Sequence, residues 1–351
     1  MRSVLEQGNV ADEADEGRGE ARRRGPMGGT IQGPRTRVRM VLPSRNLQFM
    51  AFWVALAGGL FVAEGLDVDV GVAAEPLDAS IAFRAGVAEV GILPPPLYLR
   101  LIADRCPVVV CANLLRNDPL NVVLTRPAAA RVGIAGGLPV AEAVRRLRGL
   151  KIGVAPGPTD RLRALCAWAG IGASGVELVT LTGPEQNPAF AAGSVDGLYA
   201  HTPYLERALV DDGGVLVVHA SGGGADPVRV AQVHALVASR VFAEQAPRVV
   251  AGLVAALGAA QDLLRHKDLR AVEALLACGF AGLERRHLER TLEISAPAMP
   301  PTPAVTCATL RQADTFRVTG SGLPGMSDAE LARFVWDEVR CAGSHDLPEY
   351  C

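Results

Sequence analysis

The side chains in this sequence with useful chemistry are hydroxyls and amides placed directly after predicted strands. Ser44, Asn46 and Gln48 follow the first predicted strand, and Thr159 opens the helix after a later one. Ser44, Asn46 and Thr159 are also ordinary helix N-caps, so capping and ligand contact are both open for them. A helix N-terminus presents free N–H groups and a positive dipole end, which suits an anionic or strongly polar ligand. These positions predict hydrogen bonding to a bound molecule.

Apolar and aromatic groups follow two further predicted strands. The loop Leu93–Pro95 lacks backbone donors at its prolines, so Leu93 and Pro94 are expected to contribute shape and apolar contact. Tyr204 offers stacking area and a hydroxyl, and His201 could stack or titrate. Because ligands of α/β proteins bind beyond the carboxyl ends of strands, all four loops are expected to meet in one cleft. The combination favours a ligand with an apolar or aromatic body and a polar end over a small inorganic oxyanion.

Three charged side chains near these loops are further candidates. Glu75 could pair with a cationic group of a ligand, and Arg45 and Arg116 could neutralise an anion. Almost all cationic residues of the chain are arginines, so a single arginine carries little information about function. A solvated surface position is the preferred interpretation for each of the three.

Motifs of common enzyme and metal chemistries are absent from the sequence. It contains no G-x-S-x-G elbow, no P-loop lysine motif and no G-x-G-x-x-G after a strand. The 7 cysteines are odd in number and scattered, without a C-x-x-C pair or a Cys/His cluster. We therefore expect no cofactor and no metal ion, and we interpret most cysteines as small core residues.

Length and composition are those of an ordinary globular protein. The 351 residues are 49% hydrophobic and 21% charged, which suggests two domains, or one domain interrupted by another. The net charge of −2 provides no basic field that would attract nucleic acid, and we expect a monomer. The uncharged run Leu47–Ala63 is at the lower limit of length for a membrane span and is interpreted as a buried helix.

Residues 1–36 mix both charges and lack apolar periodicity, so they are expected to form a disordered tail. No apolar core of a signal peptide follows its arginines, which predicts a cytoplasmic protein for the sequence as written. The alternative is an exported, periplasmic or membrane-associated protein whose start is misassigned. A start at Met40 would, however, remove most of the strand Arg37–Leu42.

From Arg37 onward, short β-like runs alternate with helical runs, which predicts an α/β fold with largely parallel sheets. The expected strands are Arg37–Leu42, Asp67–Val72, Glu89–Leu93, Val108–Asn113, Asn121–Thr125, Lys151–Ala155, Val176–Thr180, Gly197–Tyr199, Val215–His219 and Gln232–Val237. The expected helices are Gln48–Glu64, Leu77–Arg84, Leu97–Ala103, Thr159–Ala169, Glu185–Ala192, Tyr204–Val210, Pro247–Leu264, Asp268–Ala277, Glu284–Glu293 and Ser327–Val339.

Two lobes are expected because the rhythm changes at the turn Arg116–Pro119 and the last third of the chain is helical. Lobe one should combine residues 37–113 with 238–340 and is therefore discontinuous. Lobe two should cover 127–230. The crossing segments 114–126 and 231–237 should form the hinge.

Several motifs in order resemble those of the solute-binding proteins of ABC importers, closest to the nitrate/sulfonate/taurine and thiamine-pyrimidine-precursor group. They are Gly59–Val68 (GLFVAEGLDV), Phe83–Gly91 (FRAGVAEVG), Leu147–Val154 with Pro156–Thr159 (LRGLKIGV, PGPT), and Ala192–Gly197 (AGSVDG) followed by Pro203-Tyr204. The resemblance implies a two-lobed, type II periplasmic-binding-protein-like fold that binds a sulfonate-, pyrimidine- or aromatic-acid-like solute. It also implies an ABC permease as partner. His201 and Tyr204 stand at the aromatic-PY position of that group.

Two enzyme types resemble the same fold and form the alternative, a cytosolic enzyme. An aromatic sulfinate desulfinase would require a nucleophilic cysteine after the first strand, where this sequence has Asn46 and Leu47. A thiamine-pyrimidine synthase would require a Cys-rich motif, which is missing. The resemblance therefore favours binding without a covalent step, with lobe closure by hinge bending.

Overall fold

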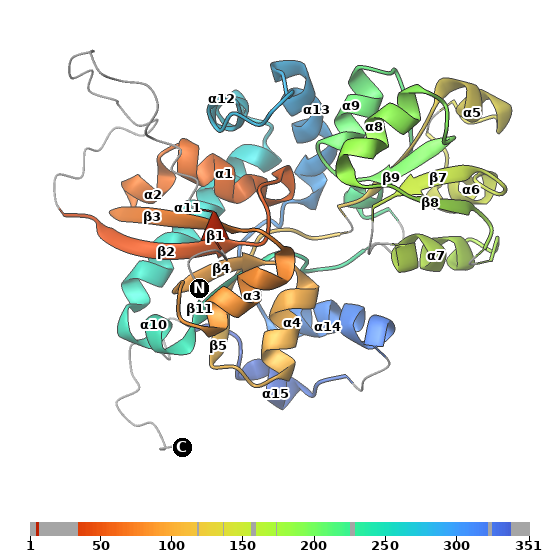
Figure 1. The fold of residues 1–351 in the computed structure, drawn as a ribbon. Coiled ribbons are helices and arrows are strands. Elements are labelled where there is room, and N and C mark those ends of the chain that lie inside the picture. The colour runs from red at the N-terminus through yellow and green to blue at the C-terminus, as the bar shows by residue number, and fades with distance from the viewer. Residues whose placement is uncertain are drawn as a thin grey trace, which may run out of the picture.

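Two separate β-sheets organise the chain, and helices cover both faces of each (Figure 1). The computed structural model describes residues 5–6, 34–117, 119–135, 137–155, 159–172, 174–224, 229–321 and 325–337. The predicted α/β class is confirmed. We call the part built on the first sheet lobe one and the part built on the second sheet lobe two.

The sheet of lobe one has six strands in the order β1 (Leu5–Glu6), β3 (Leu66–Ala73), β2 (Thr36–Leu42), β4 (Val90–Leu93), β11 (Ala235–Ser239) and β5 (Val108–Asn113). β2 runs parallel to β3 and β4, whereas β11 lies antiparallel between β4 and β5. The sheet of lobe two has the order β10 (Val215–Val218), β6 (Asn121–Leu124), β9 (Gly197–Ala200), β7 (Lys151–Val154) and β8 (Glu177–Thr180). Here β7 is parallel to β8 and β9, and β6 is antiparallel to β9 and β10.

Helices pack on both faces of each sheet, which explains why the strands are apolar on both sides. Along β2, Met40 and Leu42 belong to one buried cluster and Val41 to another. Along β6, Val122 and Val123 are divided in the same way. The helices are α1 (Met50–Ala57), α2 (Leu60–Ala63), α3 (Pro76–Arg84), α4 (Pro95–Ala103), α5 (Arg126–Arg131), α6 (Val140–Arg146), α7 (Thr159–Trp168), α8 (Gly183–Ala191), α9 (Tyr204–Val210), α10 (Arg240–Gln245), α11 (Pro247–Arg265), α12 (Leu269–Ala277), α13 (Arg285–Ser295), α14 (Cys307–Ser321) and α15 (Asp328–Ala332).

The crossing segments between the lobes are placed differently from the predicted hinge. β6 is an interior strand of the second sheet and β11 an interior strand of the first, so the chain crosses at 114–120 and 219–234. The two segments run side by side: Asn117 N donates to Val230 O at 2.7 Å and Leu114 N to His234 O at 2.8 Å. β6 and part of β11, which lie within the predicted hinge segments 114–126 and 231–237, are therefore strands of the two sheets and not linkers.

The first predicted helix, Gln48–Glu64, is wrong as a single element. The structure divides it into a 3₁₀ turn η1 (Leu47–Phe49), α1 and α2. The break follows from the glycine pair, because Gly59 has φ +72°, a conformation that residues with a Cβ rarely adopt. At Gly58 a Cβ would stand 2.6 Å from the Val54 carbonyl oxygen.

The C-terminal third also differs in detail. α10 and α14 were not expected, and α15 is much shorter than the predicted Ser327–Val339, because the chain turns after Ala332 so that Val335 pairs with Val110. α11 alone among the described helices is long and apolar enough to span a membrane. It packs against α1 and α2 with Val250 and Leu253 fully buried, which is typical of a core helix.

Most of the predicted tail, residues 1–36, lies outside the described residues. Within it, Leu5 and Glu6 pair with Ala73 and Val72 at the edge of the first sheet. Thr36 already belongs to β2, paired with Leu66.

Candidate ligand-binding site between the lobes

The loop after β2 is held by hydrogen bonds among the predicted site residues themselves. Asn46 caps η1: its Oδ1 accepts from Gln48 N at 2.7 Å, and its Nδ2 donates to Ser44 Oγ at 3.1 Å. Trp53 Nε1 donates to Asn46 O at 2.9 Å. Ser44 and Asn46 therefore position the loop, and the Gln48 side chain makes no hydrogen bond to any residue the structure describes.

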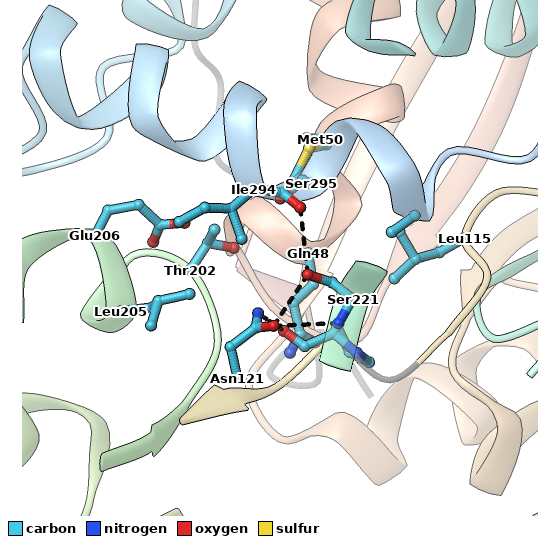
Figure 2. A pocket seen from close by; sticks show the side chains of 12 residues that line it. Gln48, Met50, Leu115, Asn121, Thr202, Leu205, Glu206, Ser221, Ile294 and Ser295 are labelled. Carbon is cyan, nitrogen blue, oxygen red and sulfur yellow. Dashed lines mark hydrogen bonds between the residues drawn. The ribbon is translucent and has the colours of Figure 1, made fainter. Parts of the chain in front are cut away.

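A cavity lies between the lobes next to this loop (Figure 2). Three parts of the chain line this cavity. Lobe one contributes Gln48, Met50, Leu115 and Ala298, and the end of α13 contributes Ile294 and Ser295. Lobe two and its crossing segments contribute Pro119, Asn121, Thr202, Leu205, Glu206 and Ser221. The space open to the centre of a water molecule is about 20 Å³. This admits a water-sized group, whereas sites for whole organic ligands are an order of magnitude larger. The lobes are therefore closed on each other, and a larger ligand requires them to open.

Both crossing segments contribute to the floor of the cavity through a compact polar network. Ser221 N and Ser221 Oγ lie 3.1 Å from Asn121 Oδ1, and Asn117 Nδ2 donates to Ser221 O at 2.9 Å. Ser221 Oγ is also 3.3 Å from Ile294 O, which accepts a second bond from His219 Nε2 at 2.8 Å. These contacts tie lobe two to the end of α13.

Glu206, on α9, is the one carboxylate among the described residues that line the cavity. Its side chain points toward Thr202 and Ile294 in Figure 2, it is 0% exposed, and neither carboxylate oxygen has a hydrogen-bond partner among the described residues. Burial raises the pKa of Glu206 to about 8, and the nearby Thr291 hydroxyl and Arg290 guanidinium offset this only in part. Buried carboxylates without a partner are uncommon and are concentrated at functional sites.

A second, smaller cavity of about 10 Å³ adjoins the first, and Gln48 lines both. His234 forms part of its wall, with Nδ1 3.2 Å from Gln48 O and its ring 4.9 Å from that of Phe49. The pKa of His234 is lowered to about 3, mainly by burial, and the charges of Arg161 and His201 act in the same direction. The imidazole is therefore neutral at pH 7, and Nδ1 carries the proton that it donates to Gln48 O.

The predicted site residues His201, Tyr204 and Thr159 line neither cavity. His201 Nδ1 is 2.5 Å from Thr202 O, and its ring meets that of Tyr204 edge-on at 5.7 Å. The Tyr204 hydroxyl rests on Gly183 at the start of α8, where a Cβ would overlap it. Thr159 is the first residue of α7, and the predicted contact residues 156–158 lie outside the described residues.

Leu93 and Pro94 differ from the expectation that they form the apolar wall of the site. Leu93 is 0% exposed and packs in the buried cluster under α3 and α4, because its side chain points to the face of β4 that these helices cover. Pro94 is the N-cap of α4. Neither lines either of the two cavities described above.

The three charged candidates have structural roles. The Arg45 guanidinium lies 5.2 Å from the ring centre of Trp53 and 5.1 Å from that of Phe280. Arg116 Nε donates to Pro297 O at 2.9 Å. Glu75 caps α3 in a capping box with Asp78.

Sequence reasoning missed the polar side chains of the cavity wall other than Gln48, namely Asn121, Thr202, Glu206, Ser221 and Ser295. Asn121 begins a strand that was assigned to the hinge. Glu206 lies in the first turn of a helix, where an acidic residue is ordinary because it complements the helix dipole. The sequence therefore contained no local signal for this carboxylate.

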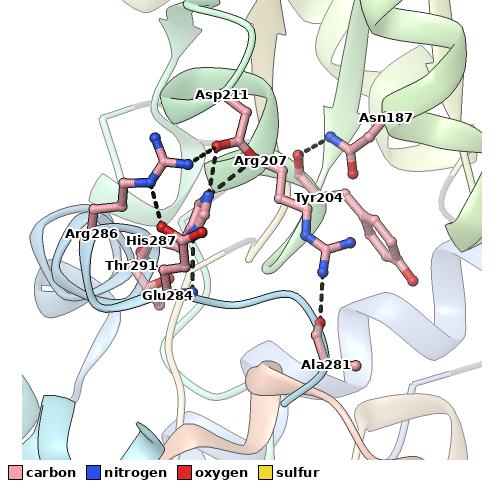
Figure 3. A network of polar contacts seen from close by, with 9 residues as sticks. All are labelled: Asn187, Tyr204, Arg207, Asp211, Ala281, Glu284, Arg286, His287 and Thr291. Atoms are coloured by element: carbon pink, nitrogen blue, oxygen red, sulfur yellow. Dashed lines mark hydrogen bonds and ion pairs between the residues drawn. The ribbon is translucent and has the colours of Figure 1, made fainter. Parts of the chain in front are cut away.

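A second set of interlobe contacts joins α9 to α13 (Figure 3). Asp211 accepts from His287 Nε2 at 2.9 Å and from Arg286 at 2.8 Å, and Arg207 donates to Ala281 O at 2.6 Å. His287 Nδ1 accepts from Glu284 N at 3.1 Å, so the ring proton sits on Nε2 and points to Asp211. α13 thus bridges the lobes close to Glu206.

Comparisons with known proteins agree with this architecture. The structure is similar to the periplasmic aliphatic sulphonate binding protein SsuA from Escherichia coli, with 16% identity, a TM-score of 0.64, and coverage of 86% of this chain and 97% of that one. It is similar to the periplasmic nitrate-binding protein NrtA from Synechocystis PCC 6803, with 13% identity, a TM-score of 0.62, and 90% of each chain covered. The desulfurization enzyme DSZB is similar too, with 16% identity, a TM-score of 0.56, and coverage of 89% and 100%.

These likenesses establish the fold as two-lobed and periplasmic-binding-protein-like of type II, as the motifs implied. No curated protein sequence matches the chain. The model of the family described as "NMT1/THI5 like" matches residues 46–267, which is more than half of the chain. The chain therefore belongs to the NMT1/THI5-like family.

Proposed function

We propose that this protein reversibly binds one small polar organic molecule between its lobes and acts as the substrate-binding component of an ABC importer. The observation that carries the proposal is the closed cavity in which Gln48 of lobe one faces Asn121, Thr202 and Glu206 of lobe two. A ligand held between such walls favours the closed arrangement, and its release requires opening. The similar proteins named for sulfonate and nitrate binding support a solute-binding role.

The proposal includes a permease partner, a monomeric binding protein and export from the cytoplasm. The relatives SsuA and NrtA are described as periplasmic, which favours export over the cytoplasmic location predicted from the charged first residues. Cell fractionation of the producing organism, with light scattering of the purified protein, tests location and oligomeric state together.

The test of binding is a thermal-shift screen of sulfonates, nitrate, pyrimidines and aromatic sulfinates, followed by calorimetry on each hit. A ligand that binds the folded state raises the melting temperature according to its occupancy. Small-angle scattering of the protein with and without a hit should show a smaller radius of gyration when the ligand is bound. If no compound binds at a single site, the binding function is refuted.

The alternative is an enzyme, favoured by the likeness to the desulfurization enzyme DSZB. Among the residues the structure describes, none of the cysteines Cys106, Cys111, Cys166, Cys278 and Cys307 lines either cavity. Burial raises the pKa of Cys166 and of Cys278 to about 11, so both are thiols at neutral pH. Turnover of a hit ligand, abolished by a single substitution in the cavity, would establish the enzyme in place of the binding protein.

A further inference from the structure

Two polar side chains from opposite lobes face the same cavity without partners. Glu206 projects from α9 of lobe two, and Gln48 projects from the loop of lobe one (Figure 2). Neither oxygen of the Glu206 carboxylate accepts a hydrogen bond from a described residue, and the Gln48 amide makes none either. A buried polar group without a partner is costly, so its retention at this place points to a ligand that supplies one.

Two hydrogen-bond donors near Glu206, on Thr291 and Arg290, are committed elsewhere. The Thr291 hydroxyl donates its single hydrogen to His287 O at 3.0 Å. The Arg290 guanidinium pairs with Glu293 at 2.5 Å. On the floor of the cavity, the Ser221 hydroxyl has Asn121 Oδ1 and Ile294 O as acceptors. Both carboxylate oxygens of Glu206 therefore remain free to accept hydrogen bonds from a ligand.

Size gives a second, independent restriction on what the cavity receives. Its volume of about 20 Å³ accommodates a group the size of one water molecule. An ammonium or amino group has that size, whereas a tetrahedral sulfonate carries three oxygens and needs donors for each. An oxyanion would also oppose the ionisation of Glu206, whereas an ammonium group beside it stabilises the carboxylate form.

Resting on the proposed function, we infer that the ligand places an amino or ammonium group in this cavity, where Glu206 and the Gln48 side-chain oxygen accept its N–H donors. Glu206 is then the residue that selects an amine-bearing solute over a bare oxyanion. The rest of the ligand lies in the cleft that opens when the lobes separate.

Three probes of matched size test this inference: benzylammonium, phenylmethanesulfonate and benzyl alcohol. They share one ring and differ in the charge and donor capacity of the polar end. Thermal shift and calorimetry are run with each probe at millimolar concentration on the native protein, on Glu206→Gln, and on Glu64→Gln as the control. Glu64 is an exposed glutamate of lobe one, outside both cavities.

We expect benzylammonium to bind the native protein and the Glu64→Gln control equally, and the sulfonate to bind neither. In Glu206→Gln the affinity for benzylammonium should fall by about tenfold or more, because a charge-assisted hydrogen bond is lost. Glu206→Asp keeps an ionisable carboxyl group and should retain part of the affinity. This variant replaces Glu206→Gln if Glu206→Gln does not fold.

Two results would overturn the inference. One is sulfonate affinity equal to or above that of benzylammonium, and the other is benzylammonium binding that is absent from the native protein or unchanged in Glu206→Gln. In each case the proposed function is judged separately, since the wider screen of sulfonates, nitrate and pyrimidines still reports whether any ligand binds between the lobes.

Discussion

Replacing the buried carboxylate of Glu206 by an amide should change how the stability of the protein depends on pH. The pKa of Glu206 is raised from 4.5 to about 8 in the folded state, mainly by burial. The folded protein therefore holds this proton at pH values where the unfolded chain has lost it. Stability is unaffected below pH 4.5, falls as the pH rises from there to about 8, and is constant above.

The size of the effect follows from the shift. A difference of 8 − 4.5 = 3.5 pKa units corresponds to about 5 kcal/mol of unfolding free energy lost between the two pH values. Glu206→Gln removes this loss, because the amide does not titrate. If the lobes separate, water reaches the Glu206 carboxylate and its ionisation is no longer costly. The loss of unfolding free energy in the native protein therefore cannot exceed the free energy needed to separate the lobes.

The assay is urea unfolding of the native protein, Glu206→Gln and the exposed control Glu64→Gln at pH values on both sides of this range. We expect the unfolding free energy of Glu206→Gln, relative to that of the native protein, to increase by up to about 5 kcal/mol with rising pH. The difference in unfolding free energy between Glu64→Gln and the native protein should not change with pH. The reasoning is refuted if the difference in unfolding free energy between Glu206→Gln and the native protein is the same at the lowest and the highest pH. Such a result would mean that the carboxylate is paired or hydrated in the folded state.

Three further predictions concern the rest of the site and the contact between the lobes. Thr159→Ala and Tyr204→Ala should each weaken binding of a confirmed ligand by roughly 1–3 kcal/mol in calorimetry, and unchanged affinity in both would mean that the ligand does not extend beyond the cavities to these two residues. Gly183→Ala should lower the unfolding free energy by roughly 1–3 kcal/mol, since the new Cβ overlaps the Tyr204 hydroxyl, and a stability equal to that of the native protein would contradict that contact. Asp211→Asn weakens the bond to His287 and should cost about 1 kcal/mol or less, because the Asp211 side chain is 38% exposed. Scattering should then show more open molecules, and an unchanged radius of gyration would argue against a role in closure.

Local pattern was enough to predict the α/β class and most strands. Period-2 runs such as Asp67–Val72 and apolar runs such as Val108–Asn113 are strands in the structure, and Gly65 ends the first helical region with φ +73°. The motifs around Gly59–Val68 and Ala192–Gly197 also indicated the family, which the match over residues 46–267 confirmed. Each of these signals depends on residues close together in the sequence, so it can be read without knowledge of the fold.

Membership of a sheet, in contrast, was decided by tertiary structure. The sequence of β6, Asn121–Leu124, does not show whether this segment crosses between the lobes or belongs to a sheet. It is an interior strand because it pairs with β9 on one side and β10 on the other. Leu93 was expected in the cleft because it ends a strand, yet the alternation of side chains along β4 directs it under α3 and α4.

The candidate site shows the same division between local and long-range information. The sequence identified Gln48 by its position after a strand, but it contained no signal that Glu206, 158 positions later, would face the same cavity. Helical periodicity says only that one face of α9 is buried, and it does not say which element covers that face. The placement of Glu206 and Gln48 in the wall of one cavity depends on how the lobes close and on α13 bridging them. That geometry arises from packing between residues far apart in the chain.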